Sequence, residues 1–172
     1  MFSLILFTVG FGCNTGSSNN ALVASSTDGK IQMTFPSDWK NVPNLSEIAT
    51  LQYANNAETE FIIAFSELKS DFPVNFTLQQ YSDTVRQNLK TVLNSVQESG
   101  PTTLTINGYS AIQYAIQGKL TSQNDLDITY IQTVIETTTG FHQILAWSES
   151  VQFGQSFLVF QNILNTFKAL QP

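Results

Sequence analysis

The pattern of apolar and polar side chains predicts three strands in the first 65 residues of the chain. Residues 29–35, GKIQMTF, alternate apolar and polar positions from Ile31 to Phe35, which is typical of a strand with one buried face. Residues 49–53, ATLQY, predict a second short strand. Residues 61–65, FIIAF, are apolar on both faces, which favours a central strand covered on both sides.

The apolar period changes to steps of three and four after residue 77. The recurring positions are Leu78, Tyr81, Val85, Leu89, Val92 and Val96. They form one face of an amphipathic helix. Thr77 is a suitable N-cap because its hydroxyl can accept a hydrogen bond from the first helical turn. Gly100 and Pro101 predict the end of this helix.

Four further strands are predicted in the second half. Asn107-Gly108 is a strong hairpin signal between two runs that carry apolar residues. Residues 126–137, LDITYIQTVIET, predict a long β-branched strand. Gly140 then turns the chain into another strand, FHQILAW, at residues 141–147.

The last predicted element is a helix. Its apolar positions are Phe153, Phe157, Phe160, Leu164 and Phe167, and Ser148 or Ser150 is the predicted cap. Strands joined by short turns are antiparallel, and two helices that each have an apolar face must cover sheet surface. We therefore expect one α+β domain over residues 28–172, an antiparallel sheet of about six to seven strands flanked by two main helices.

The first 27 residues have a different character. Residues 1–11, MFSLILFTVGF, form an apolar run that is shorter than the roughly 20 residues needed to span a bilayer. The run has the length of a signal-peptide hydrophobic region, but no Lys or Arg precedes it, so we expect residues 1–12 to be a signal peptide with a basic leader upstream. Residues 13–27 are rich in Ser, Asn and Gly, which predicts a flexible tether.

Composition narrows the classes of partner. The 172 residues carry a net charge of −6, and the seven Lys and Arg residues are scattered along the chain. Phosphate binding needs clustered basic residues, so we expect no nucleic-acid partner. Cys13 is the only cysteine, which excludes an internal disulfide and the usual zinc patterns.

No motif specifies a reaction. His142 is the only histidine, and the predicted hairpin places the acidic Glu136 across from its strand. One histidine with one carboxylate is a poor metal site, and the chain contains no Gly-x-Ser-x-Gly nucleophile elbow. We expect no catalytic residue, no metal ligand and no cofactor. A hydrolase or metal-dependent enzyme that uses His142 is one alternative.

Three other features have competing interpretations. Trp39 and Trp147, with the Phe-rich final helix, form either plain core, which we favour, or a pocket that carries an apolar small molecule. Asp125 and Asp127 lie in a loop that we interpret as a solvated turn rather than a calcium site. Residues 66–76, SELKSDFPVNF, place phenylalanines beside Pro73, either as a partner surface or as a lid on the core.

Three stretches together resemble the PsbP-like fold superfamily. They are FPSDW at 35–39, INGYSAIQY at 106–114, and FHQILAW at 141–147 followed by a helix that ends in ILNTFKAL at 163–170. The group includes PsbP proteins of photosystem II, DcrB-type bacterial lipoproteins and a yeast Ran-binding protein. The resemblance covers residues 28–170. It implies an antiparallel sheet flanked by helices, and a non-enzymatic role in assembly or partner binding.

The N-terminal segment resembles the lipobox of bacterial lipoproteins. An apolar run, the small Gly12, Cys13 and a polar tether follow one another, and Gly10 stands where the lipobox usually has a Leu-like residue. The resemblance implies that the sulfur of Cys13 is lipidated. A buried thiol in an N-terminal strand is the alternative.

Together the two resemblances predict a membrane-tethered lipoprotein with a binding or assembly domain. It would be exported, face the periplasm or a thylakoid lumen, contact the membrane through its lipid and bind a protein partner. A photosystem II-associated PsbP relative in a cyanobacterium is one such protein.

Overall fold

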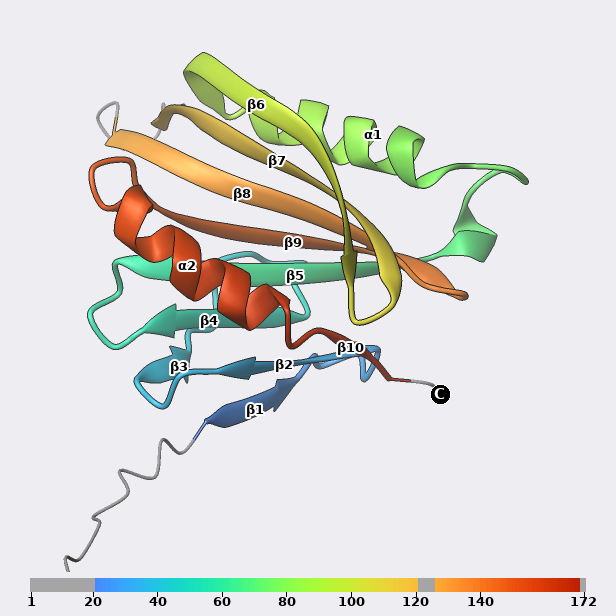
Figure 1. The fold of residues 1–172 in the computed structure, drawn as a ribbon, viewed down its shortest axis with the longest axis horizontal. Helices are drawn as coiled ribbons and strands as arrows, with labels where there is room; N and C mark the ends of the chain where they lie inside the picture. The colour runs from blue at the N-terminus through green and yellow to red at the C-terminus, as the bar shows by residue number, and fades with distance from the viewer. Residues whose placement is uncertain (1–20, 121–125, 171–172) are drawn as a thin grey trace, which may run out of the picture.

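The computed structural model describes residues 21–120 and 126–170. The strands and helices of this part of the chain are arranged as two sheets and two α-helices (Figure 1). In chain order they are β1 (Leu22–Ser25), β2 (Ile31–Phe35), β3 (Trp39–Asn41), β4 (Leu51–Asn55), β5 (Glu60–Leu68), η1 (Lys69–Asp71), α1 (Leu78–Lys90), β6 (Leu93–Ile106), β7 (Tyr109–Leu120), β8 (Leu126–Glu136), β9 (Gly140–Glu149), α2 (Phe153–Leu164) and β10 (Lys168–Ala169).

The large sheet has seven strands in the order β3-β4-β5-β9-β8-β7-β6. All neighbouring strands in it are antiparallel. The small sheet has three strands in the order β1-β2-β10. The predicted fold class is confirmed, and β5 lies centrally between β4 and β9 as its apolar sequence predicts.

The two helices pack on opposite faces of the large sheet, and in Figure 1 α2 crosses the near face while α1 lies behind. Alternation along β5 shows the division, because Ile62 belongs to the core beneath α2 and Ile63 to the core on the α1 side. The small sheet closes the α2-side core with Ile31 and Met33. Each face therefore has its own apolar core.

The folded part begins earlier than the sequence predicts. Residues 22–25 were expected to be part of a flexible tether over residues 13–27, but they form strand β1. This strand pairs antiparallel with β2, from Leu22 opposite Phe35 to Ser25 opposite Gln32. Ala24 is 4% exposed and belongs to the α2-side core. Its segment is too short to show a period in the sequence, and its strand conformation comes from pairing with β2.

The first helix begins where predicted and ends earlier. Thr77 Oγ1 accepts from the Gln80 backbone N–H, and the Gln80 side chain accepts from the Thr77 N–H, so the predicted N-cap is confirmed. The helix ends at Lys90 rather than at Gly100 and Pro101. Residues 93–106 form β6, which pairs with β7. Val92 and Val96 continue the helical period, but pairing with β7 determines the conformation of this segment.

The second helix is confirmed without its predicted cap. Its N-cap is Gln152, which makes no side-chain cap hydrogen bond, and Ser148 lies inside β9. Ser150 Oγ instead lies 2.8 Å from Thr129 Oγ1. Phe167 follows the helix and is fully buried against Tyr109. The apolar positions up to Leu164 therefore belong to the helix, whereas Phe167 is buried in the turn that follows it.

Candidate functional site

His142 is a buried imidazole with neutral partners. It is 3% exposed, its Nδ1 lies 2.9 Å from Ser66 Oγ, and its Nε2 lies 3.1 Å from Thr137 Oγ1. Burial lowers the pKa of His142 to about 4, against a smaller opposing effect of Asp28. The ring is therefore uncharged at neutral pH.

Glu136 does not face His142. In the β8–β9 register Glu136 lies opposite Phe141, whereas His142 lies opposite Ile135, so the two side chains are on opposite faces of the sheet. Glu136 Oε1 forms an ion pair of 2.7 Å with Lys69 Nζ. The acid–base pair that the sequence suggested is therefore not formed.

Metal-binding side chains are not grouped in the part of the chain that the structure describes. Within residues 21–120 and 126–170, His, Cys, Asp and Glu form no cluster of three or more that could hold a metal ion. Asp125 lies outside the described residues. Asp127 lies on β8 opposite Lys119.

A cavity of about 440 Å³ lies beside His142, where the small sheet meets the end of the β5 and β9 strands. Lys30 and Asp28 line it, and their charges are 3.5 Å apart. The remaining lining includes the apolar Leu68 and Leu170. Glu67 also lines this cavity, so Lys30 stands against two carboxylates there.

The two tryptophans lie on opposite faces of the large sheet. Trp39 is 4% exposed and packs in the α2-side core with Phe35 and Phe160, so the core interpretation is confirmed for it. Trp147 stacks on Phe61 on the α1 side, with ring centroids 5.2 Å apart. The two rings therefore do not share one pocket.

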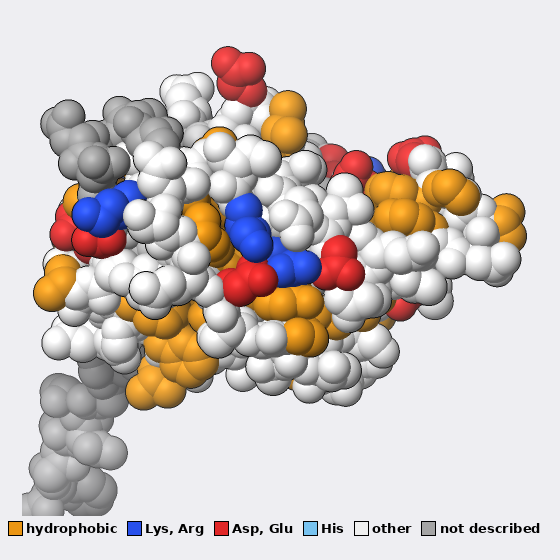
Figure 2. Space-filling view, turned by 90° about the horizontal axis from the view of Figure 1, so that it is seen from above, with side chains coloured by type: hydrophobic (Ala, Val, Ile, Leu, Met, Phe, Trp, Pro, Cys, Tyr) orange, Lys and Arg blue, Asp and Glu red, His pale blue; other side chains and the backbone are white. Residues whose placement is uncertain are grey.

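The connection between β5 and α1 packs as a lid. Phe72 stacks on Phe76 with centroids 4.8 Å apart, and both rings meet Phe141 edge-on. Val74 remains 91% exposed in this connection. Figure 2 views the molecule from above, and it shows apolar side chains gathered at the right end of the face turned to the viewer.

Charged side chains on α1 and β6 neutralise one another. Arg86 pairs with Asp83 at 2.9 Å and with Glu98 at 2.7 Å, and Lys90 lies 3.3 Å from Glu98. Figure 2 shows basic and acidic side chains close together in the middle of this face. This cluster fastens α1 to β6 and presents no excess of either charge.

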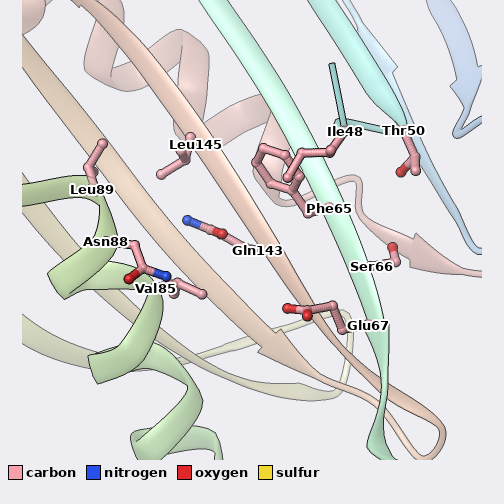
Figure 3. A pocket seen from close by; sticks show the side chains of 10 residues that line it. All are labelled: Ile48, Thr50, Phe65, Ser66, Glu67, Val85, Asn88, Leu89, Gln143 and Leu145. Carbon is pink, nitrogen blue, oxygen red and sulfur yellow. The ribbon is translucent and has the colours of Figure 1, made fainter. Parts of the chain in front are cut away.

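An open groove of about 490 Å³ lies on the α1 side of the large sheet (Figure 3). Val85, Asn88 and Leu89 of α1 form one wall, and Gln143 and Leu145 of β9 form the floor. The far side is lined by Phe65 and Glu67 of β5, and by Ile48 and Thr50.

The groove follows from strand register and helix placement. Phe65 of β5 lies opposite Gln143 of β9, and Ile63 lies opposite Leu145, so period-two alternation directs these side chains to one face. Helix α1 packs mainly on β8, two strands away from β5. The surface between α1 and β5 is therefore left open.

Two polar side chains distinguish this groove. Gln143 is 9% exposed, and its amide makes no hydrogen bond with the described residues (Figure 3). Glu67 accepts a hydrogen bond from the Tyr81 hydroxyl through Oε2. Burial, and then the contact with Glu67, raises the pKa of Tyr81, so the phenol keeps its proton.

The sequence contained a signal for this site. Along FHQILAW, one face carries Phe141, Gln143, Leu145 and Trp147, so Gln143 is the one amide in an apolar row. A neutral amide on a buried strand face needs a hydrogen-bond partner. Its position over an open groove depends on where α1 packs, which the pattern does not specify.

We found no protein-family model and no curated protein that matches the chain. Solved structures do match it. The cyanobacterial PsbP (CyanoP) of Synechocystis sp. PCC 6803 has a TM-score of 0.62 and 11% identity, over 92% of this chain and 97% of its own.

Two further structures extend the likeness. LpqN, involved in cell envelope biogenesis of Mycobacterium tuberculosis, has a TM-score of 0.62 and 18% identity, over 88% of this chain and 91% of its own. The Saccharomyces cerevisiae Ran-binding protein Mog1p has a TM-score of 0.60 and 12% identity, over 88% and 96% of the two chains. At these identities the likeness is one of fold.

Proposed function

We propose that this chain, which has the PsbP-like fold, is an exported, membrane-tethered protein whose domain binds a protein partner and catalyses no reaction. The observation that carries the proposal is the open α1-side groove, where the amide of the largely buried Gln143 has no hydrogen-bond partner among the described residues and reaches the opening. A bound partner would supply that hydrogen bond.

The neighbours in fold support a binding role. They are a Ran-binding protein, a protein involved in cell envelope biogenesis and a cyanobacterial PsbP. The Glu136–His142 pair that the enzymatic alternative would use is not formed, because the two side chains lie on opposite faces of the sheet. A photosystem II-associated role in a cyanobacterium is the most specific form of this proposal.

The anchor is assigned to Cys13, which lies outside the described residues. In this proposal residues 1–12 are a signal peptide, the Cys13 sulfur carries lipid, and the residues that follow connect it to β1. Among the helices of the described ranges, none has the length and apolar character needed to cross a membrane. The lipid would place the domain at a periplasmic or lumenal membrane surface.

Intact-mass analysis of the membrane fraction tests the anchor. We expect a lipid-sized mass increase on the membrane-bound protein, which Cys13→Ser abolishes while releasing the protein from membranes. Ser17→Ala, four residues away, is the control and should behave as the unaltered protein. An unmodified full-length chain would overturn this part of the proposal.

Photo-crosslinking in native membranes tests the partner. Benzoylphenylalanine placed at Asn88, on the groove wall, should give one discrete crosslinked protein. The same group at Leu158, which is 68% exposed on α2 and therefore on the opposite face, should not give that product. No discrete product from Asn88 under repeated trials would argue against a partner at this groove.

A further inference from the structure

We infer that the α1-side groove binds an extended peptide segment of the partner, in which a basic residue and an apolar residue occupy alternate positions. This inference rests on the proposed function and names the chemistry of the segment that is bound. Three parts of the groove define it: an apolar floor, an unpaired amide and a single carboxylate.

The apolar part holds one side chain. Phe65, Leu89 and Leu145 converge from β5, α1 and β9 around the groove, whose volume is about 490 Å³. That volume is within the range of about 300–1,000 Å³ typical of ligand sites. The opening to solvent suits a side chain that projects from a segment lying along the surface.

The amide part matches a peptide bond. A glutamine side chain offers one carbonyl acceptor and one NH₂ donor, which is the complement of a backbone N–H and C=O. Gln143 is 9% exposed and makes no hydrogen bond with the described residues. An extended segment passing over Gln143 would satisfy both functions, whereas an acyl chain would satisfy neither.

The neighbouring interior is also short of hydrogen-bond partners. Gln132 lies opposite Leu145, which places it diagonally from Gln143 on the same sheet face. Gln132 Oε1 on β8 and Ser82 Oγ on α1 are both buried and have no hydrogen-bond partner among the described residues. Unlike these two atoms, the amide of Gln143 reaches the open groove, where a bound segment can pair with it.

The charge of the groove selects a basic residue. Among the residues that the structure describes, Glu67 is the only charged side chain that lines the groove, and one of its oxygens accepts a hydrogen bond from Tyr81. The other oxygen, Oε1, has no partner among the described residues and can accept a charge-assisted hydrogen bond from Lys or Arg. The chain's net charge of −6 adds to this preference and disfavours anionic lipid.

The spacing follows from β5. Phe65 and Glu67 lie two residues apart on the same face of one strand, which corresponds to about 7 Å. Alternate side chains of an extended peptide have the same spacing. The expected motif is therefore a basic and a large apolar residue separated by one position, in either order.

Selection from a displayed library of random twelve-residue peptides on the purified full-length protein tests this motif. Peptides selected by the unaltered protein should carry Lys or Arg two residues before or after Leu, Ile, Phe or Met. Glu67→Gln should lower the enrichment of the basic residue about tenfold, the size of effect that loss of one charge-assisted hydrogen bond gives, while keeping the apolar preference. Gln143→Leu should weaken both preferences.

Glu58→Gln is the matched control, because Glu58 precedes β5 at the end away from Glu67 and pairs with Lys40. It should keep the full motif, and thermal melting should show that all variants are folded. A library that yields no motif, or a motif that Glu67→Gln leaves unchanged, would overturn the inference. Competition of selected peptides by phosphatidylglycerol vesicles would also overturn it, in favour of lipid.

These results are separable from those of the proposed function. A discrete crosslink from Asn88 in membranes without any selected motif would reject the peptide inference and retain a protein partner. Loss of the crosslink together with a clear motif would instead show that the groove binds such peptides while the membrane role is wrong.

Discussion

At the scale of single residues, burial and hydrogen bonding determine what His142 can do. The imidazole packs beside Phe167, with ring centroids 5.5 Å apart, and its two nitrogens meet Ser66 and Thr137. Protonation would place a charge in this buried setting, and the nearby Asp28 offsets only part of the cost of burying it. The neutral form is therefore the one compatible with the fold.

The pH dependence of stability should reveal this burial. The folded-state pKa of His142, about 4, lies below the ordinary 6.5, so the unfolded state binds more protons between these values and stability falls as pH falls. We expect the free energy of unfolding to drop by about 2 kcal/mol from pH 7 to pH 5 on account of His142. Urea unfolding at the two pH values measures it.

His142→Gln is the control for this effect, since an amide can bond both hydroxyls without titrating. Its unfolding free energy should depend less steeply on pH by about the same 2 kcal/mol. Equal pH dependence of the two proteins would contradict the assigned pKa.

At the scale of elements, the backbone of the β8–β9 turn lies very close to the backbone at the end of β5. A Cβ added at Gly140 would lie 2.5 Å from the Glu67 carbonyl oxygen, which belongs to the backbone and cannot move alone. The Lys69 N–H also donates to the Thr139 carbonyl at 2.9 Å. This corner therefore sets how the β5 and β9 strands begin to pair.

Gly140→Ala should lower the free energy of unfolding by about 1–3 kcal/mol, because the added methyl group forces the strands apart. Gly154→Ala in α2 is the matched substitution, and a Cβ there would meet nothing within 4 Å. It should raise stability by up to about 1 kcal/mol through helix propensity. Chemical denaturation of both variants checks the pair, and similar losses at the two sites would refute the close-approach argument.

At the scale of the whole molecule, the two sheets cooperate around α2. The small sheet contributes Ala24, Met33 and Phe35 to the same core as α2 residues such as Phe160. Asn107 reaches across to donate to the Phe167 carbonyl at 2.7 Å, and Thr166 Oγ1 accepts from the Thr34 N–H at 2.7 Å. The chain after α2 is thus held by both sheets.

A truncation series tests the boundary of the domain. A chain that begins at Ala21 retains β1, whereas one that begins at Asp28 loses it and exposes the edge of β2. We expect the shorter chain to lose roughly 2 kcal/mol of unfolding free energy, from the apolar area that β1 buries. Guanidinium denaturation compares the two, and equal midpoints would mean that β1 contributes nothing to stability.

Interactions between residues close together in the sequence were sufficient to predict much of this fold. Asn107 and Gly108 both adopt positive φ, 48° and 86°, in the predicted hairpin turn, because that turn requires residues that tolerate it. Thr77 caps α1 through neighbours in sequence. The apolar composition of β5 requires cover on both sides, which predicts its central position. These features depend on residues within a few positions of one another.

Tertiary packing alone decided the rest, because it depends on partners distant in sequence. Val92 and Val96 continue the helical period of α1, but residues 93–106 become β6, since pairing with β7 outweighs helix propensity. Glu136 and His142 appear close in the sequence, yet a one-position difference in register places them on opposite faces. Gln143 could be recognised as a buried amide from its strand, but only the placement of α1 away from β5 left it facing an open groove.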